Sequence, residues 1–125
     1  MEIYVLSNLK YVVIKKIPYP DKESPLNMIP HMYICIREDT DNIYLLKCQT
    51  YKHYHYYRNS QPTNRFVEQA DPNRNPFNAK TLIDLDKVFI IDKSAALKTI
   101  TPISDSFYTE LLAVFNYETA EKIVL

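Results

Sequence analysis

The chain has 125 residues and contains no glycine. Glycine lets a backbone approach a phosphate group closely, so this sequence excludes the Gly-rich loops of P-loop and dinucleotide-binding proteins. Its turns must instead use asparagine, aspartate and proline, which tolerate or impose turn conformations. The segments "EDTDN" (38–42) and "DPNRNP" (71–76) have this character. We therefore expect turns at both places.

Composition predicts one domain, residues 1–125, because 46% hydrophobic and 24% charged residues are typical of a globular chain. No apolar run approaches the roughly 18 residues of a membrane helix. The N-terminal segment "MEIYVLSNLKYVVIKK" is interrupted by Asn8 and Lys10 and does not resemble a signal peptide. We expect a cytoplasmic protein with no membrane association. In a reducing compartment, Cys35 and Cys48 are expected to be buried thiols and not a disulfide.

Runs of β-branched, aromatic and apolar residues dominate the first two thirds of the chain. They predict strands at residues 2–7, 11–17, 31–38, 42–51 and 82–92, with a proline-rich loop at 18–30. The polar segment 58–81 is either a functional loop or includes a short helix around "RFVEQA". Segment 104–124 begins with capping residues and predicts a helix with apolar positions at Phe107, Leu111, Leu112 and Phe115. This order predicts an α+β, mainly β fold: a small, strongly bent antiparallel barrel with a C-terminal helix.

Charge is distributed unevenly although the net charge is zero. Residues 47–80 carry a net charge of +4, whereas residues 1–46 carry −1 and residues 81–125 carry −3. Within the basic region, "KCQTYKHYHYYR" (47–58) combines three cations, two histidines and four tyrosines without any carboxylate. Cations attract phosphates and tyrosines stack on unpaired bases, so this segment predicts an RNA-binding surface.

Several segments resemble the endoribonuclease toxins of type III toxin–antitoxin systems, the ToxN/AbiQ type. "EIYVLSNLKYVVIKKIPYPDK" is similar to their opening, "PHMYICI" to a core strand, and "IYLLKCQTYKHYH" to the strand that ends in a Ser/Thr-x-Lys element. "TLIDLDKVFIID" and "FYTELLAVF" are similar to their late strand and final helix, and "LDKVFIIDKS" also resembles MazF/PemK toxins. The resemblance implies an SH3-like barrel of the MazF/PemK kind.

The resemblance also implies a function, namely metal-independent RNA cleavage by a phage-defence toxin that a small structured antitoxin RNA neutralises. No cofactor is implied. An assembly of several copies with the antitoxin is compatible with this interpretation. Two alternatives stay open: a MazF/PemK-like toxin with a protein antitoxin, and a non-catalytic RNA- or protein-binding module on the same fold.

Thr50-Tyr51-Lys52 matches the Ser/Thr-x-Lys element, so the resemblance implies catalytic roles for Thr50 and Lys52. His53 and His55 are further candidates because imidazole titrates near neutral pH, and which residue acts as the base stays open. The predicted RNA-binding residues are Tyr51, Tyr54, Tyr57, Arg58, Arg65, Arg74 and Lys80. His31 is an additional titratable candidate, since it follows Ile29-Pro30, where MazF/PemK toxins carry Arg-Pro.

Metal binding is not predicted. His53 and His55 lack a third ligand at a convincing spacing. Asp84 and Asp86 could bind a divalent cation, but two carboxylates fall short of the oxygen ligands that such an ion prefers. We expect these two aspartates to be solvated or to cap a turn.

Overall fold

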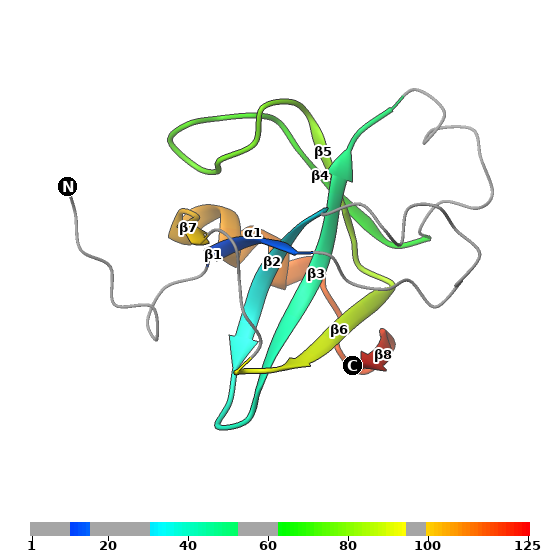
Figure 1. The fold of residues 1–125 in the computed structure, drawn as a ribbon. Coiled ribbons are helices and arrows are strands. Elements are labelled where there is room, and N and C mark those ends of the chain that lie inside the picture. Colours follow the sequence, from blue (N-terminus) through cyan, green and yellow to red (C-terminus); the bar gives the residue numbers. More distant parts are fainter. Residues whose placement is uncertain (1–10, 16–30, 53–62, 95–99) are drawn as a thin grey trace.

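The computed structural model describes residues 11–15, 31–52, 63–94 and 100–125. Within these ranges it contains eight strands and one helix (Figure 1). They are β1 (Tyr11–Lys15), β2 (His31–Glu38), β3 (Asn42–Thr50), β4 (Arg65–Glu68), β5 (Thr81–Asp84), β6 (Lys87–Asp92), β7 (Ile100–Pro102), α1 (Asp105–Val114) and β8 (Glu121–Val124). The predicted strand at 2–7 and the predicted loop at 18–30 lie outside the described residues. No helix in the described part is long and apolar enough to cross a membrane.

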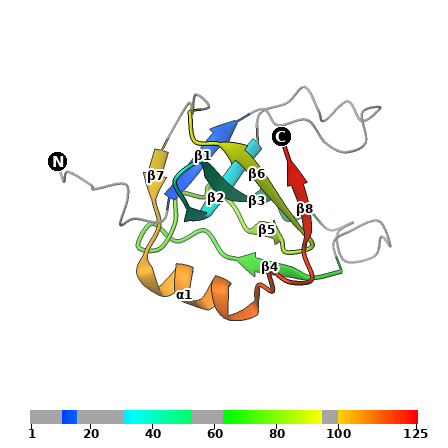
Figure 2. The same ribbon diagram turned by 90° about the horizontal axis from the view of Figure 1, so that it is seen from below.

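The eight strands form one mixed sheet around β3, which pairs with β2, β5 and β6. The sheet runs β4-β5-β3-β2-β1-β7, and β6 and β8 branch from β3. The prediction of a mainly β fold with a helix is confirmed. The described strands do not close into a barrel, and the sheet is not purely antiparallel, because β8 runs parallel to β6. A parallel pair needs a crossover, and here β7 and α1 provide it (Figure 2).

Segment 82–92 forms two strands, so the prediction of one continuous strand there is wrong. In the pairing with β3, Cys48 lies opposite Ile83, and Leu45 lies opposite Phe89. An advance of three residues along β3 therefore corresponds to six residues along the opposing segment. The extra residues lie between β5 and β6 and do not pair with β3. Such an insertion bends a sheet and strengthens its local twist.

Two aspartates stabilise this break, in agreement with the expectation that they are solvated or cap a turn. The carboxylate of Asp84 accepts a hydrogen bond from the backbone N–H of Asp86 over 2.7 Å. The carboxylate of Asp86 accepts from the backbone N–H groups of Thr63 (2.6 Å) and Asn64 (3.1 Å). The two side-chain carboxylates thus accept hydrogen bonds from backbone N–H groups at the break and in the segment beside it.

The first predicted turn, at "EDTDN", forms the β2–β3 hairpin without glycine. The Asp39 carboxylate accepts hydrogen bonds from the backbone N–H groups of Asp41 (3.0 Å) and Asn42 (2.7 Å). It also accepts one from the Tyr44 hydroxyl over 2.7 Å. The Tyr44 hydrogen bond, followed by the backbone bonds, lowers the pKa of Asp39. The Asp39 carboxylate therefore stabilises a turn that, in many short hairpins, depends on a glycine in the left-handed conformation.

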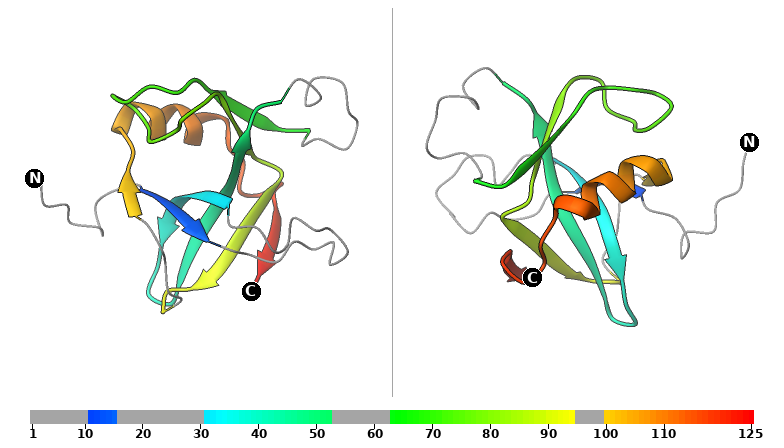
Figure 3. Two further views of the ribbon diagram at one scale, coloured as in Figure 1. Left: turned by 45° about the horizontal axis from the view of Figure 1, so that its top comes forward. Right: turned by 180° about the vertical axis from the view of Figure 1, so that it is seen from behind.

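Strands β2 and β3 are buried on both faces, which explains their nearly continuous apolar sequences. One face packs under α1 through Phe107 and Leu111, both fully buried (Figure 3, right). The opposite face forms a second cluster. Its members are Tyr33, Cys35, Ile43, Leu45, Phe89 and Ile91. Both cysteines are buried thiols, as predicted.

Helix α1 begins as predicted and ends ten residues earlier than predicted. The Ser104 side chain accepts a hydrogen bond from the Phe107 N–H over 3.1 Å and caps the N-terminus. The helix ends at Val114, and residues 121–124 form strand β8 instead. Leu112 is exposed because it lies away from the stripe that Phe107 and Leu111 define.

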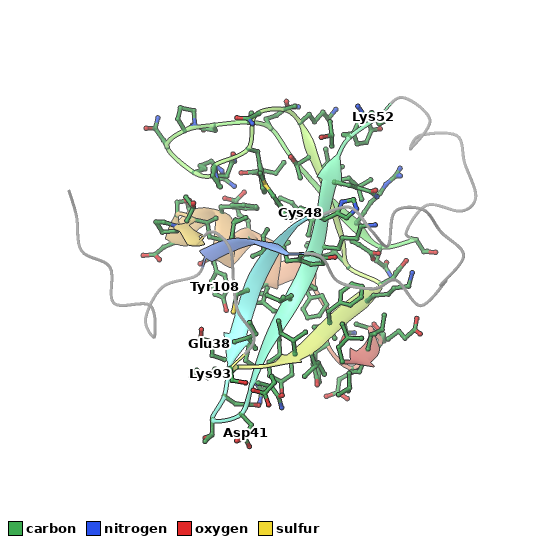
Figure 4. All side chains as sticks on the ribbon, viewed as in Figure 1. Glu38, Asp41, Cys48, Lys52, Lys93 and Tyr108 are labelled. Carbon is green, nitrogen blue, oxygen red and sulfur yellow. The ribbon has the colours of Figure 1, made fainter. Side chains whose placement is uncertain are left out.

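A bulge in β2 connects the sheet to this helix. Cys35 pairs with Leu45 and Arg37 pairs with Tyr44, which leaves Ile36 as an extra residue. The Tyr108 hydroxyl donates a hydrogen bond to the Ile36 carbonyl over 2.7 Å (Figure 4). The helix thus satisfies a backbone group near the bulge, where the ladder register shifts.

Candidate functional site

A cavity of about 210 Å³ lies where β2, β3 and β5 meet. It sits toward the end of β3 that carries Cys48 and Lys52, opposite the hairpin at Asp41 (Figure 4). Its polar lining residues are His31, Gln49, Thr50, Asn78 and Thr81, and its apolar ones are Met32, Cys48, Phe77 and Ala79. The cavity therefore combines an apolar floor with several hydrogen-bonding groups.

Strand alternation places Thr50 at this cavity. Leu46 and Cys48 belong to the core under α1, and residues two apart share a face of a strand. Thr50 continues that face beyond the core, is exposed, and pairs with Thr81 of β5. Its hydroxyl has no hydrogen-bond partner among the described residues, so it is available to a ligand.

His31 joins Thr50 at the cavity, although the two residues are 19 positions apart in the sequence. It is the first residue of β2 and precedes Met32, which pairs with Cys48 of β3. The antiparallel hairpin thus brings the start of β2 to the end of β3. His31 and Thr50 therefore both border this cavity, although strand alternation puts the His31 side chain on the face of Tyr33 and the Thr50 side chain on the face of Cys48.

Tyr51 and Lys80 lie beside this cavity, next to its lining residues Thr50 and Thr81. The Tyr51 backbone N–H donates a hydrogen bond to the Lys80 carbonyl over 2.8 Å. The Lys80 ammonium lies 4.5 Å from the centre of the Tyr51 ring, within cation–π range. Two of the predicted RNA-binding residues are therefore held together by backbone and side-chain contacts.

Lys52 is exposed and lies just past the end of β3 (Figure 4). The strand assignment ends at Thr50, so the predicted strand is one residue too long. The remaining predicted residues from the central segment are His53, Tyr54, His55, Tyr57 and Arg58. They lie outside the described residues.

Arg65 and Arg74 do not line the cavity. Arg65 begins β4 and pairs in register with Asp84 of β5. Segment 65–68 is thus a strand, and the alternative of a short helix around "RFVEQA" is wrong. A β-branched and an aromatic residue at its centre fit an edge strand paired with β5.

Arg74 is bound by two glutamates. Its guanidinium contacts both carboxylate oxygens of Glu68, at 2.8 and 3.2 Å, and one oxygen of Glu110 at 2.7 Å. Hydrogen bonds to Glu68 and Glu110 raise the pKa of Arg74. The charge of Arg74 is therefore largely balanced within the fold, where it joins β4 to α1.

Lys47 is buried, which also reduces the positive charge available at the surface. It is 8% exposed, and burial lowers the pKa of its ammonium to about 8. Asp84 opposes this shift and Lys87 adds to it. Asp84 is buried as well, and burial raises the pKa of its carboxyl. The regional charge of +4 therefore overstates the charge that a ligand would meet.

Gln49 and Asn78 are cavity residues that sequence reasoning missed. Neither amide side chain has a hydrogen-bond partner in the described part of the chain. Asn78 reaches the cavity because Lys80 and Thr81 pair with the end of β3. Only that long-range pairing identifies it, since an asparagine two residues after a proline otherwise indicates a turn.

Within residues 11–15, 31–52, 63–94 and 100–125, no group of three His, Cys, Asp or Glu side chains is arranged to hold a metal ion. Asp84 and Asp86 instead bind backbone N–H groups. Cys48 lines the cavity, but burial raises the pKa of its thiol and so disfavours the thiolate.

Comparisons with protein-family models, curated proteins and solved structures gave no match to this chain. The resemblance to ToxN/AbiQ toxins therefore rests on the sequence segments quoted above.

Proposed function

We propose that this chain is a metal-independent endoribonuclease toxin of a toxin–antitoxin system. The observation that carries the proposal is the cavity that His31 and Thr50 line together, with Tyr51 and Lys80 beside it. It supplies a titratable group, a hydroxyl, a cation and an aromatic ring within one region. A chain that cleaves RNA without a metal needs these groups and few others.

The reaction uses the nucleophile that RNA itself contains. A base removes the proton of a ribose 2′-OH, and the 2′ oxygen then forms a bond to the adjacent phosphorus. The bond from phosphorus to the 5′ oxygen breaks, and an acid protonates the leaving oxygen. The products are a 2′,3′-cyclic phosphate and a 5′-hydroxyl.

Each candidate residue has a role that fits its chemistry. His31 would exchange a proton, and Thr50 would orient the 2′-OH or donate to a phosphate oxygen. Lys52 would stabilise the charge that develops on the phosphate in the transition state. His53 and His55 remain candidates for the same proton transfers.

The proposal includes a finer description of the fold. The β2 bulge and the β5–β6 break both bend the sheet, and bends of this kind are what an SH3-like barrel requires. We assign the sheet to the MazF/PemK kind on this ground and on the resemblance. A structured antitoxin RNA would then bind across the cavity and its flanking lysines and block access to substrate.

Cleavage of an end-labelled single-stranded RNA in EDTA tests the proposal. The expected 5′ fragment carries a cyclic phosphate. Loss of cleavage in EDTA that magnesium restores would contradict the metal-free mechanism. RNA binding without any cleavage would instead support the alternative of a non-catalytic RNA-binding module.

A further inference from the structure

We infer that the cavity holds one unpaired base of a single-stranded RNA, and that Asn78 determines which base it prefers. This inference rests on the proposed function in one respect only, namely that RNA is the ligand. It adds a specificity site to the chemistry that His31, Thr50 and Lys52 would perform.

The size of the cavity favours a single ring system. Its volume of about 210 Å³ lies below the roughly 300 Å³ at which sites for drug-sized ligands begin. A whole nucleotide with its phosphate would therefore not fit inside. A base alone could enter while its ribose and phosphate stay outside.

The lining has the distribution of polarity that a base requires. Phe77 and Cys48 are 7% and 2% exposed and, with Met32, supply apolar surface. Asn78 and Thr50 supply polar groups in the same cavity. A nucleobase has apolar faces and hydrogen-bonding edges, so its faces match the floor and its edges match these polar groups.

The Asn78 amide is available for recognition. Asn78 is exposed, and within the described ranges its side chain is not held by a hydrogen bond. Thr81, by contrast, uses its hydroxyl to donate to the Ala79 carbonyl over 2.9 Å. An amide offers both a donor and an acceptor, which is the combination that reads a base edge.

The surroundings favour a base that belongs to a nucleic acid strand over a free small molecule. Lys80 and Lys52 are exposed cations near the cavity, where a backbone phosphate on either side of the inserted base would lie. The Tyr51 ring beside Lys80 offers a surface on which the next base can stack.

Binding of uncleavable 2′-O-methyl oligonucleotides tests the inference independently of catalysis. Asn78→Asp replaces a donor-plus-acceptor group with an acceptor, so it should favour the amino group of cytosine over the carbonyl oxygen of uracil. The affinity ratio of oligocytidine to oligouridine should rise by about 5- to 150-fold, the range expected for one good base contact. An oligomer without bases should bind the wild type more weakly than oligocytidine or oligouridine does.

Asn73→Asp is the matched control, because Asn73 is exposed, undergoes the same charge change and does not line the cavity. Its affinity ratio should equal that of the wild type. The inference is overturned if Asn78→Asp leaves the ratio unchanged, or if Asn73→Asp changes it equally. Competition by free cytidine or uridine, at the same concentrations at which the oligonucleotides bind, would also overturn it, because the cavity would then be a small-molecule site. Failure of the wild type to cleave ordinary RNA would contradict the proposed function but not these binding results.

Discussion

The Lys80 ammonium lies 4.5 Å from the centre of the Tyr51 ring, and the backbones of the same two residues share a 2.8 Å hydrogen bond. Their side chains are therefore positioned by the pairing of β5 with the end of β3. A cation and an aromatic ring fixed in this way lose little freedom when a ligand binds. Under the proposed function, this pair would contact single-stranded RNA beside the cavity.

Salt dependence should identify the cations that contact phosphate. Each phosphate contact on a single strand contributes about 0.7 to the slope of log affinity against log salt concentration. Replacing Lys52, Arg65 and Lys80 together with alanine should therefore reduce the slope by about two units. Fluorescence anisotropy with labelled RNA at several salt concentrations measures it.

Arg74→Ala is the control for this experiment, because the two glutamates already balance the Arg74 charge. Its slope should match that of the wild type. An unchanged slope in the triple variant would show that these cations do not touch phosphate. A slope reduced by Arg74→Ala would show that this arginine leaves its glutamates to bind RNA.

Arg74→Ala should nevertheless destabilise the fold. Glu68 is 7% exposed and would lose the bidentate arginine, although Asn75 still donates to it over 2.9 Å. Hydrogen bonds to charged groups contribute about 1.5–3 kcal/mol, so we expect a loss of about 2 kcal/mol in the free energy of unfolding. Urea denaturation measures this loss, and Arg65→Ala serves as a comparison on the same edge. Equal stability of Arg74→Ala and wild type would show that the ion pairs do not support the fold.

Lys47 should make stability depend on pH in the alkaline range. Its pKa is about 8 when folded and 10.5 ordinarily. Below pH 8 both states carry the proton, and the folded state bears the full cost of burying the charge. Between pH 8 and 10.5 the unfolded state binds more protons, so the free energy of unfolding should rise with pH, by at most about 3 kcal/mol.

Lys47→Met should remove this rise and add about 1–3 kcal/mol of stability at pH 7, because an apolar side chain of similar length replaces a buried charge. Lys93→Met, at an exposed position, should keep the rise. Urea denaturation between pH 7 and 9.5 compares the three proteins. A rise that persists in Lys47→Met would mean that another group causes it.

Local sequence patterns predicted the elements whose neighbouring residues all indicate the same structure. The apolar runs of β2 and β3 and the aspartate-rich turn between them identify the hairpin, because each residue there has one consistent role. The capping residue Ser104 likewise identifies the start of α1. The acceptor side chains that replace glycine in the turns also follow from composition.

Long-range pairing determined the elements that were missed. Strand β8 is short and exposed, and it exists only because β6 offers an edge beside it. The β5–β6 break depends on the register of both segments against β3, which no local pattern within 82–92 contains. For the same reason Thr50 was recognisable from its motif, whereas Gln49 and Asn78 became candidates only in the folded chain.

The central claim is that RNA cleavage depends on a preorganised charge at Lys52. Losing one such group usually lowers the rate about 100- to 1,000-fold while substrate binding changes little. Lys52→Arg should fall between wild type and Lys52→Ala, because a planar guanidinium differs from a compact ammonium in reach and geometry. Lys93→Ala, near the opposite hairpin end, is the matched control (Figure 4).

The most direct measurement is therefore single-turnover cleavage of single-stranded RNA in EDTA by these four proteins, with thermal melting to confirm that each is folded. Our account predicts normal cleavage by wild type and Lys93→Ala and a rate about 100- to 1,000-fold lower for Lys52→Ala. A rate for Lys52→Ala near that of the wild type would contradict the role of Lys52. Absence of cleavage by the folded wild-type protein would contradict the endoribonuclease function itself.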